Sequence, residues 1–154
     1  MSPFILAFLI GVVAGLRSMT APAAVSWAAH LGWLHVENTW LAFLGFKATP
    51  CIMSVLAIGE LIADKLPKTP SRKAPIGFIA RITTGAICGA ALGAPDQIIG
   101  GLLAGPVGAV AGTLGGYEFR ARLVGAIGGN DLPIALIEDA IAIGGSLLIV
   151  SQLT

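Results

Sequence analysis

Long apolar runs, separated by short polar connections, make up most of this chain. Of its 154 residues, 56% are hydrophobic and only 11% are charged, whereas soluble domains carry about 25% charged residues. A helix needs about 20 mostly apolar residues to cross the hydrocarbon core of a bilayer. The chain has room for several such runs and none for a separate soluble domain. We therefore expect an all-α, polytopic integral membrane helical bundle, with residues 1–154 forming a single transmembrane domain.

The runs predict about five transmembrane helices, of which the first is broken. Residues 3–16 and 21–33 are two apolar runs with a polar interruption between them. They form one long broken helix, or a crossing followed by a re-entrant or interfacial piece, and two full crossings would raise the count to six. The spans expected after the broken helix are 41–63, 76–93, 97–116 and 132–153.

The most basic segment sets the expected orientation. Residues 65–75 hold four cations and three prolines, and positively charged loops stay in the cytoplasm. We expect this loop to be cytoplasmic and the chain to be a multi-pass protein of the inner, or plasma, membrane. Counting spans from the loop brings Arg120 and Arg122 to the same side and the C-terminus to the other side. The N-terminus is inside if the broken helix crosses once, and outside if its two parts cross separately.

The interruption between the first two runs is polar and holds a proline. Arg17, Ser18 and Thr20 lie where a membrane helix normally has nothing polar, and Pro22 follows them. Proline has no amide proton and opposes the preceding helical turn, so the sequence predicts a helix break at Pro22, whose freed backbone groups need partners from protein or a cavity. An ionisable residue in such a span suggests a functional site. The alternative is a helix end at the bilayer interface, with Arg17 reaching lipid phosphates.

Glycines recur at four-residue spacing in two of the expected spans. Small residues at this spacing let helix backbones approach closely, so that van der Waals contact holds them together in lipid. We expect these ladders to form the tight core of the bundle or the seam of a homodimer, and a chain this small to work as a homo-oligomer. The expected packing positions are Gly85, Gly89, Gly93, Gly108, Gly112 and Gly116, with Gly101 and Gly105 in the same series.

A faint internal similarity suggests an inverted repeat. Residues 11–17 and 112–118 each place two glycines, four positions apart, ahead of a charged residue. With five spans, the two segments enter the membrane from opposite sides, as in many transporters.

Charged residues from distant spans collect in one layer of the expected topology. Glu60 and Asp64 share a helix face because they are four residues apart, and Arg81 lies early in the next span. Glu138 and Asp139 lie near the start of the last span, on the same side. Isolated buried charges are costly, whereas paired charges are tolerable. We therefore expect the two arginines, one in the break and one in the third span, to face these carboxylates across the bundle.

Two interpretations of this network are open. In one, the ion pairs only fix the helix register, as in a non-transporting membrane scaffold or lipid-interacting protein. In the other, which we take as the leading hypothesis, the network lines a hydrated cavity, and the chain is a small transporter or channel-like permease for a small polar or ionic solute, with proton coupling through the carboxylates. The ends of a broken helix would offer amides or carbonyls to the solute. The candidate substrate- or ion-binding residues are Arg17, Ser18, Thr20, Glu60, Asp64, Arg81, Glu138 and Asp139.

Signatures of enzymes, metal sites and nucleic-acid binding are missing from the sequence. There is no HExxH, GxSxG or Walker motif, so we expect no enzymatic activity, no cofactor and no metal. The net charge of +1 gives no reason to expect nucleic acid as a partner. Cys51 and Cys88 lack CxxC spacing and are expected to be buried small hydrophobic residues, without a disulfide. The expected partners are the lipid bilayer, a small polar or ionic solute and further copies of the chain.

The polar motifs resemble those of a known family. Residues 15–23 (GLRSMTAPA) and 59–67 (GELIADKLP) are the most specific motifs, and Pro70 with Arg72, Arg81 and residues 137–139 (IED) extend the likeness over nearly the whole chain. In these motifs the chain is similar to a family of small bacterial membrane proteins known as domain of unknown function 4126 (DUF4126). The resemblance implies a multi-span inner-membrane protein and carries no established activity.

Overall fold

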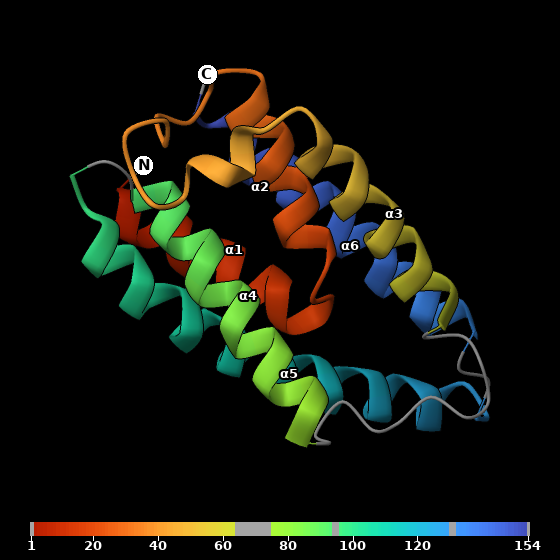
Figure 1. The fold of residues 1–154 in the computed structure, drawn as a ribbon. Coiled ribbons are helices and arrows are strands. Elements are labelled where there is room, and N and C mark those ends of the chain that lie inside the picture. Colours follow the sequence, from red (N-terminus) through yellow and green to blue (C-terminus); the bar gives the residue numbers. More distant parts are fainter. Residues whose placement is uncertain (1, 64–74, 94–95, 130–131, 154) are drawn as a thin grey trace.

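The computed structural model describes residues 2–63, 75–93, 96–129 and 132–153, and its regular structure is helical (Figure 1). The described part holds six α-helices and one short 3₁₀ helix, and it contains no strand. The expectation of an all-α fold is therefore confirmed. The elements are α1 (Pro3–Leu16), α2 (Thr20–His30), η1 (Ala42–Gly45), α3 (Ala48–Ala63), α4 (Pro75–Gly93), α5 (Ile98–Ala126) and α6 (Leu132–Ser151).

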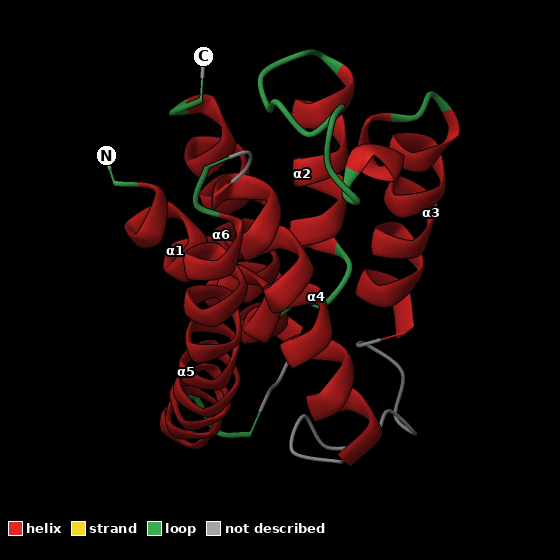
Figure 2. Cartoon of the chain, turned by 60° about the vertical axis from the view of Figure 1, so that its left-hand side comes forward, coloured by secondary structure: helices red, strands yellow, loops and turns green. Residues whose placement is uncertain are grey.

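The two N-terminal helices run in opposite directions. α1 runs in the direction of α5, since Gly11 lies against Gly105 and Gly15 lies against Ala109. The chain then reverses at residues 17–19, and α2 returns toward the end of the molecule at which both termini lie (Figure 1, Figure 2). The expectation of one long broken helix is thus corrected, because the break is a turn between two helices. We call α1, α2 and this turn the N-terminal hairpin (residues 3–30).

Pro22 lies in the first turn of α2 and does not break α1. α1 ends at Leu16, and Arg17 takes an extended backbone with φ −142° and ψ 113°. Pro22 is the third residue of α2, within the first turn, where amide protons have no partner inside the helix. The amide proton that proline lacks is therefore not needed there. The predicted break exists, but it lies at residues 17–19 and precedes Pro22.

α4 and α5 pack against each other through glycine. A side chain on Gly105 would overlap the carbonyl of Gly85, and a side chain on Gly101 would overlap that of Gly89. Gly93 lies beside the first turn of α5. With no Cβ between them, the two backbones touch directly and gain close van der Waals contact.

α1 and α5 share a second glycine seam. Gly108 and Gly112 of α5 lie against carbonyls of α1, while Gly11 and Gly15 of α1 lie against the backbone of α5. Gly116 is buried on the same helix. Both ladders are therefore used inside one chain, where they form the tight core that was the first of their two expected roles.

The parallel course of α1 and α5 also corrects the suggested inverted repeat. Residues 11–17 lie mostly on α1 and residues 112–118 lie on α5. Copies related by inversion would run in opposite directions through the membrane, whereas these two helices run the same way.

Among the described residues, two helices are long and apolar enough to cross a membrane, namely Ile98–Ala126 and Pro133–Ser151. Pro3–Leu16, Ala48–Ala63 and Gly77–Gly93 are apolar but shorter. The structure thus supports association with a membrane through at least these two helices.

The ends of α3 and α5 lie at the same end of the molecule, away from both termini (Figure 1, Figure 2). The expected topology requires this arrangement, because it brings residues 120–122 to the side of the basic loop. Residues 65–74 of that loop lie outside the described part of the chain.

Candidate functional site

The turn of the N-terminal hairpin, residues 17–19, carries a buried charge into the helix bundle. Arg17 is only 1% exposed. Its Nε donates a hydrogen bond of 2.7 Å to Asp139 Oδ1, and its Nη2 lies 2.6 Å from the same oxygen. Its Nη1 lies 3.7 Å from Glu138 Oε1. One guanidinium therefore binds two neighbouring carboxylates of α6. With a rise of 1.5 Å per residue, these carboxylates lie about 10 Å from the start of that helix.

Glu60 of α3 binds the same turn from the other side. Its Oε2 accepts a hydrogen bond of 3.1 Å from the backbone amide of Ser18 and another from the Ser18 hydroxyl. Its Oε1 accepts a hydrogen bond of 3.1 Å from the amide of Met19. These amides immediately precede α2, where the helix dipole places partial positive charge. The carboxylate thus serves as the N-terminal cap that Met19, with no capping side chain, does not provide.

The end of α1 is satisfied by donors. Arg17 Nη1 donates to the carbonyl of Leu16 at 3.0 Å, and Thr113 Oγ1 of α5 donates to the carbonyl of Gly15 at 3.3 Å. The last carbonyls of a helix carry partial negative charge. Each of the two helix ends at the turn therefore meets a side chain of opposite charge, Arg17 at α1 and Glu60 at α2.

The charge network extends from α6 to α5. Arg120 Nη1 lies 3.6 Å from Glu138 Oε2. Glu138 is thus placed between Arg17 on one side and Arg120 on the other, and these distances are longer than those of hydrogen bonds. The chain of charges Asp139, Arg17, Glu138 and Arg120 links α1, α5 and α6.

The remaining predicted residues are Thr20, Arg81 and Asp64. Thr20 is buried, and its hydroxyl has no hydrogen-bond partner in the described part of the chain. Arg81 lies one turn before Gly85 on α4, and its guanidinium folds back beside Gly77. Asp64 lies outside the described residues. The structure therefore brings together Arg17, Ser18, Glu60, Glu138 and Asp139, and it describes no direct contact of Thr20 with them.

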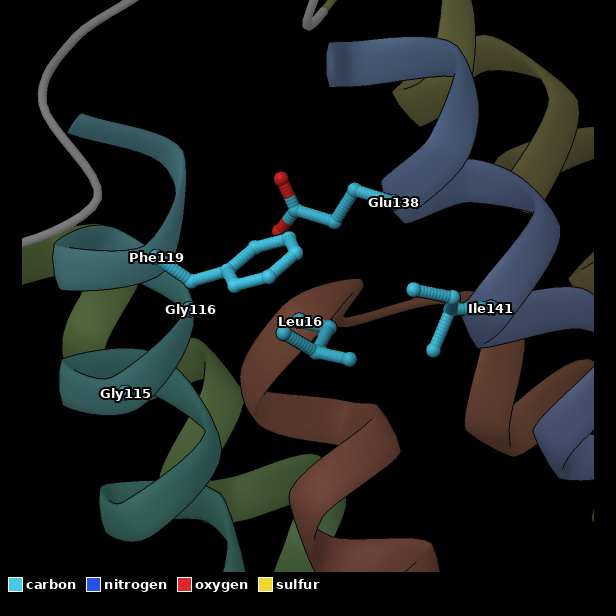
Figure 3. Close-up of a pocket in the computed structure, with 6 residues that line it drawn as sticks. All are labelled: Leu16, Gly115, Gly116, Phe119, Glu138 and Ile141. Carbon is cyan, nitrogen blue, oxygen red and sulfur yellow. The ribbon is translucent and has the colours of Figure 1, made fainter. Parts of the chain in front are cut away.

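A cavity of about 220 Å³ lies beside the turn, between α5 and α6 (Figure 3). Glu138 is the one charged residue in its lining, and its carboxylate and the ring of Phe119 point toward one another (Figure 3). Phe119 and Ile141 are 45% and 50% exposed, whereas Glu138 is 2% exposed. The cavity thus opens at the surface and has the carboxylate at its inner end. It is lined by Leu16, Gly115, Gly116, Phe119, Glu138 and Ile141.

Three side chains of this site, Arg120, Phe119 and Thr113, were not among the predicted binding residues. Arg120 was placed at the cytoplasmic end of its span by counting spans from the basic loop, and Phe119 beside it drew no attention. Thr113 is a polar residue in an otherwise apolar, glycine-rich span, and this could have marked it as a hydrogen-bond donor to a neighbouring helix. Gly11 and Gly15 were noticed only as part of a repeat, although their spacing also indicates a packing face.

The cysteines differ from expectation at one position. Cys88 is buried as expected, but Cys51 is exposed near the start of α3, and both are free thiols. Exposure of Cys51 follows from the outer position of α3, of which only Pro50 and Ala57 are buried. The described residues include no group of three histidine, cysteine, aspartate or glutamate side chains that could hold a metal ion.

The fold and the site define an all-helical protein with two helices apolar enough to span a membrane and a buried charge network at a chain reversal. The chain belongs to the family described as Domain of unknown function (DUF4126), whose model matches residues 4–152. The resemblance of the sequence motifs is thereby confirmed. No curated protein and no solved structure matches the chain.

Proposed function

We propose that this protein is a small permease of the inner membrane that moves a small polar or ionic solute, with its buried carboxylates carrying protons. The observation that carries the proposal is the turn at residues 17–19. Two helix ends meet there inside the bundle, each held by a side chain of opposite charge. Transporters commonly bind solutes where such interrupted helices end within the membrane.

The membrane arrangement that we propose has four crossing helices and a re-entrant hairpin. α1 has 14 residues and α2 has 11, which gives lengths of about 21 and 16 Å, short of the ~30 Å hydrocarbon core. α3 to α6, which have 16 to 29 residues, would cross the bilayer, with the basic loop of residues 65–75 in the cytoplasm and both termini outside. α3 is about 24 Å long, so its crossing would require local thinning of the bilayer. Exposed apolar side chains on α3 support contact with lipid, and they include Ile52, Val55, Ile58 and Ile62.

The residues of the site have distinct proposed roles. Glu60 holds the amides of Ser18 and Met19, and protonation of its carboxylate would weaken that hold and free these donors for a solute. Glu138 and Asp139 would serve as proton or cation sites, with Arg17 as their counter-ion. Thr20 would add a hydroxyl that has no hydrogen-bond partner in the described structure. Arg81 of α4 and Asp64, which lies outside the described residues, stay candidates for the same layer.

Flux into proteoliposomes tests this proposal. Vesicles with a trapped pH-sensitive dye would be exposed to gradients of alkali cations, ammonium, chloride and small carboxylates. We expect wild type to couple one of these gradients to proton movement, and Glu60→Gln and Glu138→Gln to lower that flux at least tenfold while eluting as folded protein. Glu118→Gln is the matched control, because the Glu118 side chain is 58% exposed and its ion pair in the described part of the chain is with Arg122, at 3.9 Å. Absence of flux for wild type over the whole panel would contradict the permease.

The rival is a membrane scaffold or lipid-interacting protein with purely structural ion pairs. The observation that favours it is that protein side chains already bind backbone groups at the ends of both helices. On this reading Glu60→Gln and Glu138→Gln would simply destabilise the protein, and no solute would cross. The same proteoliposomes therefore distinguish the two functions.

We also propose that the protein assembles as a homo-oligomer, because few crossing helices are available to enclose a path. Light scattering of the detergent-solubilised protein, corrected for bound detergent, measures the mass of the particle. A particle of one chain would contradict this part of the proposal.

A further inference from the structure

The cavity between α5 and α6 lies where the short helix α1 stops. Its walls come from α5 and α6, and Leu16, the last residue of α1, lies between them (Figure 3). Both carboxylate oxygens of Glu138 are buried, and they face Arg17 and Arg120. A molecule in the cavity therefore meets alkyl, aromatic and glycine surface, and the charged end of Glu138 is sealed from it. Such a surface suits a hydrocarbon chain.

In the proposed membrane arrangement, the cavity lies at the depth of the acyl chains nearest the cytoplasm. α5 has 29 residues, which makes it about 43 Å long, whereas the hydrocarbon core is ~30 Å thick. A helix that enters the core at Ile98 reaches the cytoplasmic headgroups after about 20 residues. Phe119, which is half exposed at the opening of the cavity, lies at that boundary, and Gly115 lies one turn inside it.

We propose that the cavity holds one acyl chain of an anionic phospholipid of the cytoplasmic leaflet, with the lipid phosphate at Arg122. Gly115, Phe119 and Arg122 are spaced by four and three residues, so these positions share one face of α5. The Arg122 side chain is 84% exposed, and its described ion pair, with the exposed Glu118, is 3.9 Å long. Its guanidinium is therefore available to a phosphate, which it can bind through two hydrogen bonds. The inference rests on the proposed crossing of α5 and α6 and not on transport.

The size of the cavity matches part of one acyl chain. Its volume is about 220 Å³. An engineered cavity of ~150 Å³ holds benzene, which has six carbons, so the same density allows about nine carbon atoms here. An empty space among packed side chains forfeits van der Waals contacts, and α1 ends too early to fill this one. An acyl chain restores those contacts and brings no polar group that would need a partner.

Filling the cavity tests the acyl chain, and removing the charge tests the headgroup. A Cβ on Gly115 would meet nothing within 4 Å, so Gly115→Leu places its side chain in the cavity. Native mass spectrometry of the full-length protein in detergent would measure binding of dioleoylphosphatidylglycerol and of dioleoylphosphatidylcholine as each lipid is titrated. We expect wild type to bind the anionic lipid more tightly. Gly115→Leu should weaken both lipids at least about fivefold, the lower end of what overlap in a filled space costs. Arg122→Gln should weaken phosphatidylglycerol alone, by about fivefold, the contribution of one basic residue beside anionic lipid.

Gly144→Leu is the matched control, because a Cβ there also meets nothing within 4 Å and Gly144 does not line the cavity. This variant should bind both lipids as wild type does. Equal binding of phosphatidylglycerol by Gly115→Leu and wild type would mean that the lipid adheres by charge alone, and it would overturn the site. A wild-type dimer that Gly115→Leu separates, with no lipid bound, would place a second copy over the cavity and overturn it as well.

The remaining outcomes keep this inference separate from the proposed function. If Gly115→Leu does not fold, Arg122→Gln still decides, because an unchanged affinity for phosphatidylglycerol would overturn the headgroup contact. Lipid binding without flux of any solute in proteoliposomes would uphold the site and contradict the permease. Flux without lipid binding would do the reverse.

Discussion

Arg17 keeps its charge inside the molecule because acceptors from two elements surround it. Asp139 and Glu138 face its guanidinium from α6, and the carbonyl of Leu16 accepts a further hydrogen bond. Removing a charge from water costs several kcal/mol, and a well-formed pair returns roughly that amount. The pair therefore adds little net stability, but loss of either partner leaves the other charge buried and uncompensated.

Replacement of Arg17 by methionine should lower the free energy of unfolding by about 3–5 kcal/mol, the usual cost of leaving one member of a buried ion pair alone. Thermal unfolding in detergent, followed by loss of the folded elution peak, measures the change. The double variant Arg17→Met/Asp139→Leu should recover most of the loss, because Asp139 no longer leaves a lone carboxylate and Glu138 keeps Arg120 as its partner. Arg122→Gln is the matched control, since the pair of Arg122 with Glu118 is exposed and its removal should leave the midpoint unchanged. A single variant as stable as this control would refute the buried pair.

The charged residues of the site could be found from sequence, but their pairing could not. Arg17, Glu60 and Glu138 stand out because they interrupt apolar runs, where charge is expensive. Their partners depend on how the helices pack, and Arg17 and Asp139 are 122 positions apart. Arg120 and Phe119 were not predicted to belong to the site, because residues beyond a span usually meet the bilayer interface. Charged and aromatic side chains are common there.

At the level of elements, α5 packs closely against its neighbours because the glycines on its contact faces have no side chain. It contacts α4 on one face and α1 on the other, and both contacts depend on glycine. In lipid, helices gain no hydrophobic free energy from association, so close backbone contact is what joins them. The spacing of the glycines predicted such packing, whereas the identity of each partner helix came from the structure.

Substitution of Gly105 by alanine should destabilise the protein by about 1–3 kcal/mol, the range for overpacking a tight interior. The added Cβ would overlap the carbonyl of Gly85 and crowd Gly89, so two backbones would have to separate. Gly144→Ala is the control on α6, because a Cβ there meets nothing within 4 Å. It should leave the unfolding midpoint unchanged or slightly higher, since alanine favours helix more than glycine does. Equal midpoints for the two variants would argue against the α4–α5 seam.

Helix boundaries show the same division between local and distant causes. The polar stretch after Leu16 predicted an interruption, and α1 does end there. The break was predicted at Pro22 because proline disrupts a helix interior. In the structure the helix restarts at Thr20, so Pro22 lies in a first turn, where proline is tolerated. The direction of the restarted helix is set by contacts with Glu60 and Ser54 of α3, which the local sequence does not contain.

For the whole molecule, the hairpin brings the N-terminus to the same end of the bundle as the C-terminus (Figure 1, Figure 2). Both termini lie at one end of the bundle, and α3 and α5 finish at the other (Figure 2). A single crossing of residues 3–33 would have put the termini at opposite ends. In the proposed topology, which places the C-terminus outside, the N-terminus is therefore outside as well.

Cysteine labelling in intact cells tests this orientation. In a Cys51→Ser/Cys88→Ala background, we expect Ser2→Cys and Gln152→Cys to react with a membrane-impermeant maleimide. Lys68→Cys, in the basic loop, should react only after the cells are permeabilised, because positive loops remain in the cytoplasm. Protection of Ser2→Cys together with labelling of Gln152→Cys would mean that the first two helices cross once, and the re-entrant hairpin would be wrong.

The sequence alone determined the helical class, the close packing of glycine-bearing faces and the polar residues that interrupt apolar runs. These follow from local composition and spacing, because each helix closes its own backbone hydrogen bonds. The tertiary structure decided that residues 17–19 are a reversal, that Arg17 meets Asp139, and that Phe119 faces Glu138 across a cavity. Such contacts join residues from distant helices, so they depend on how the whole chain packs and not on any one segment of it.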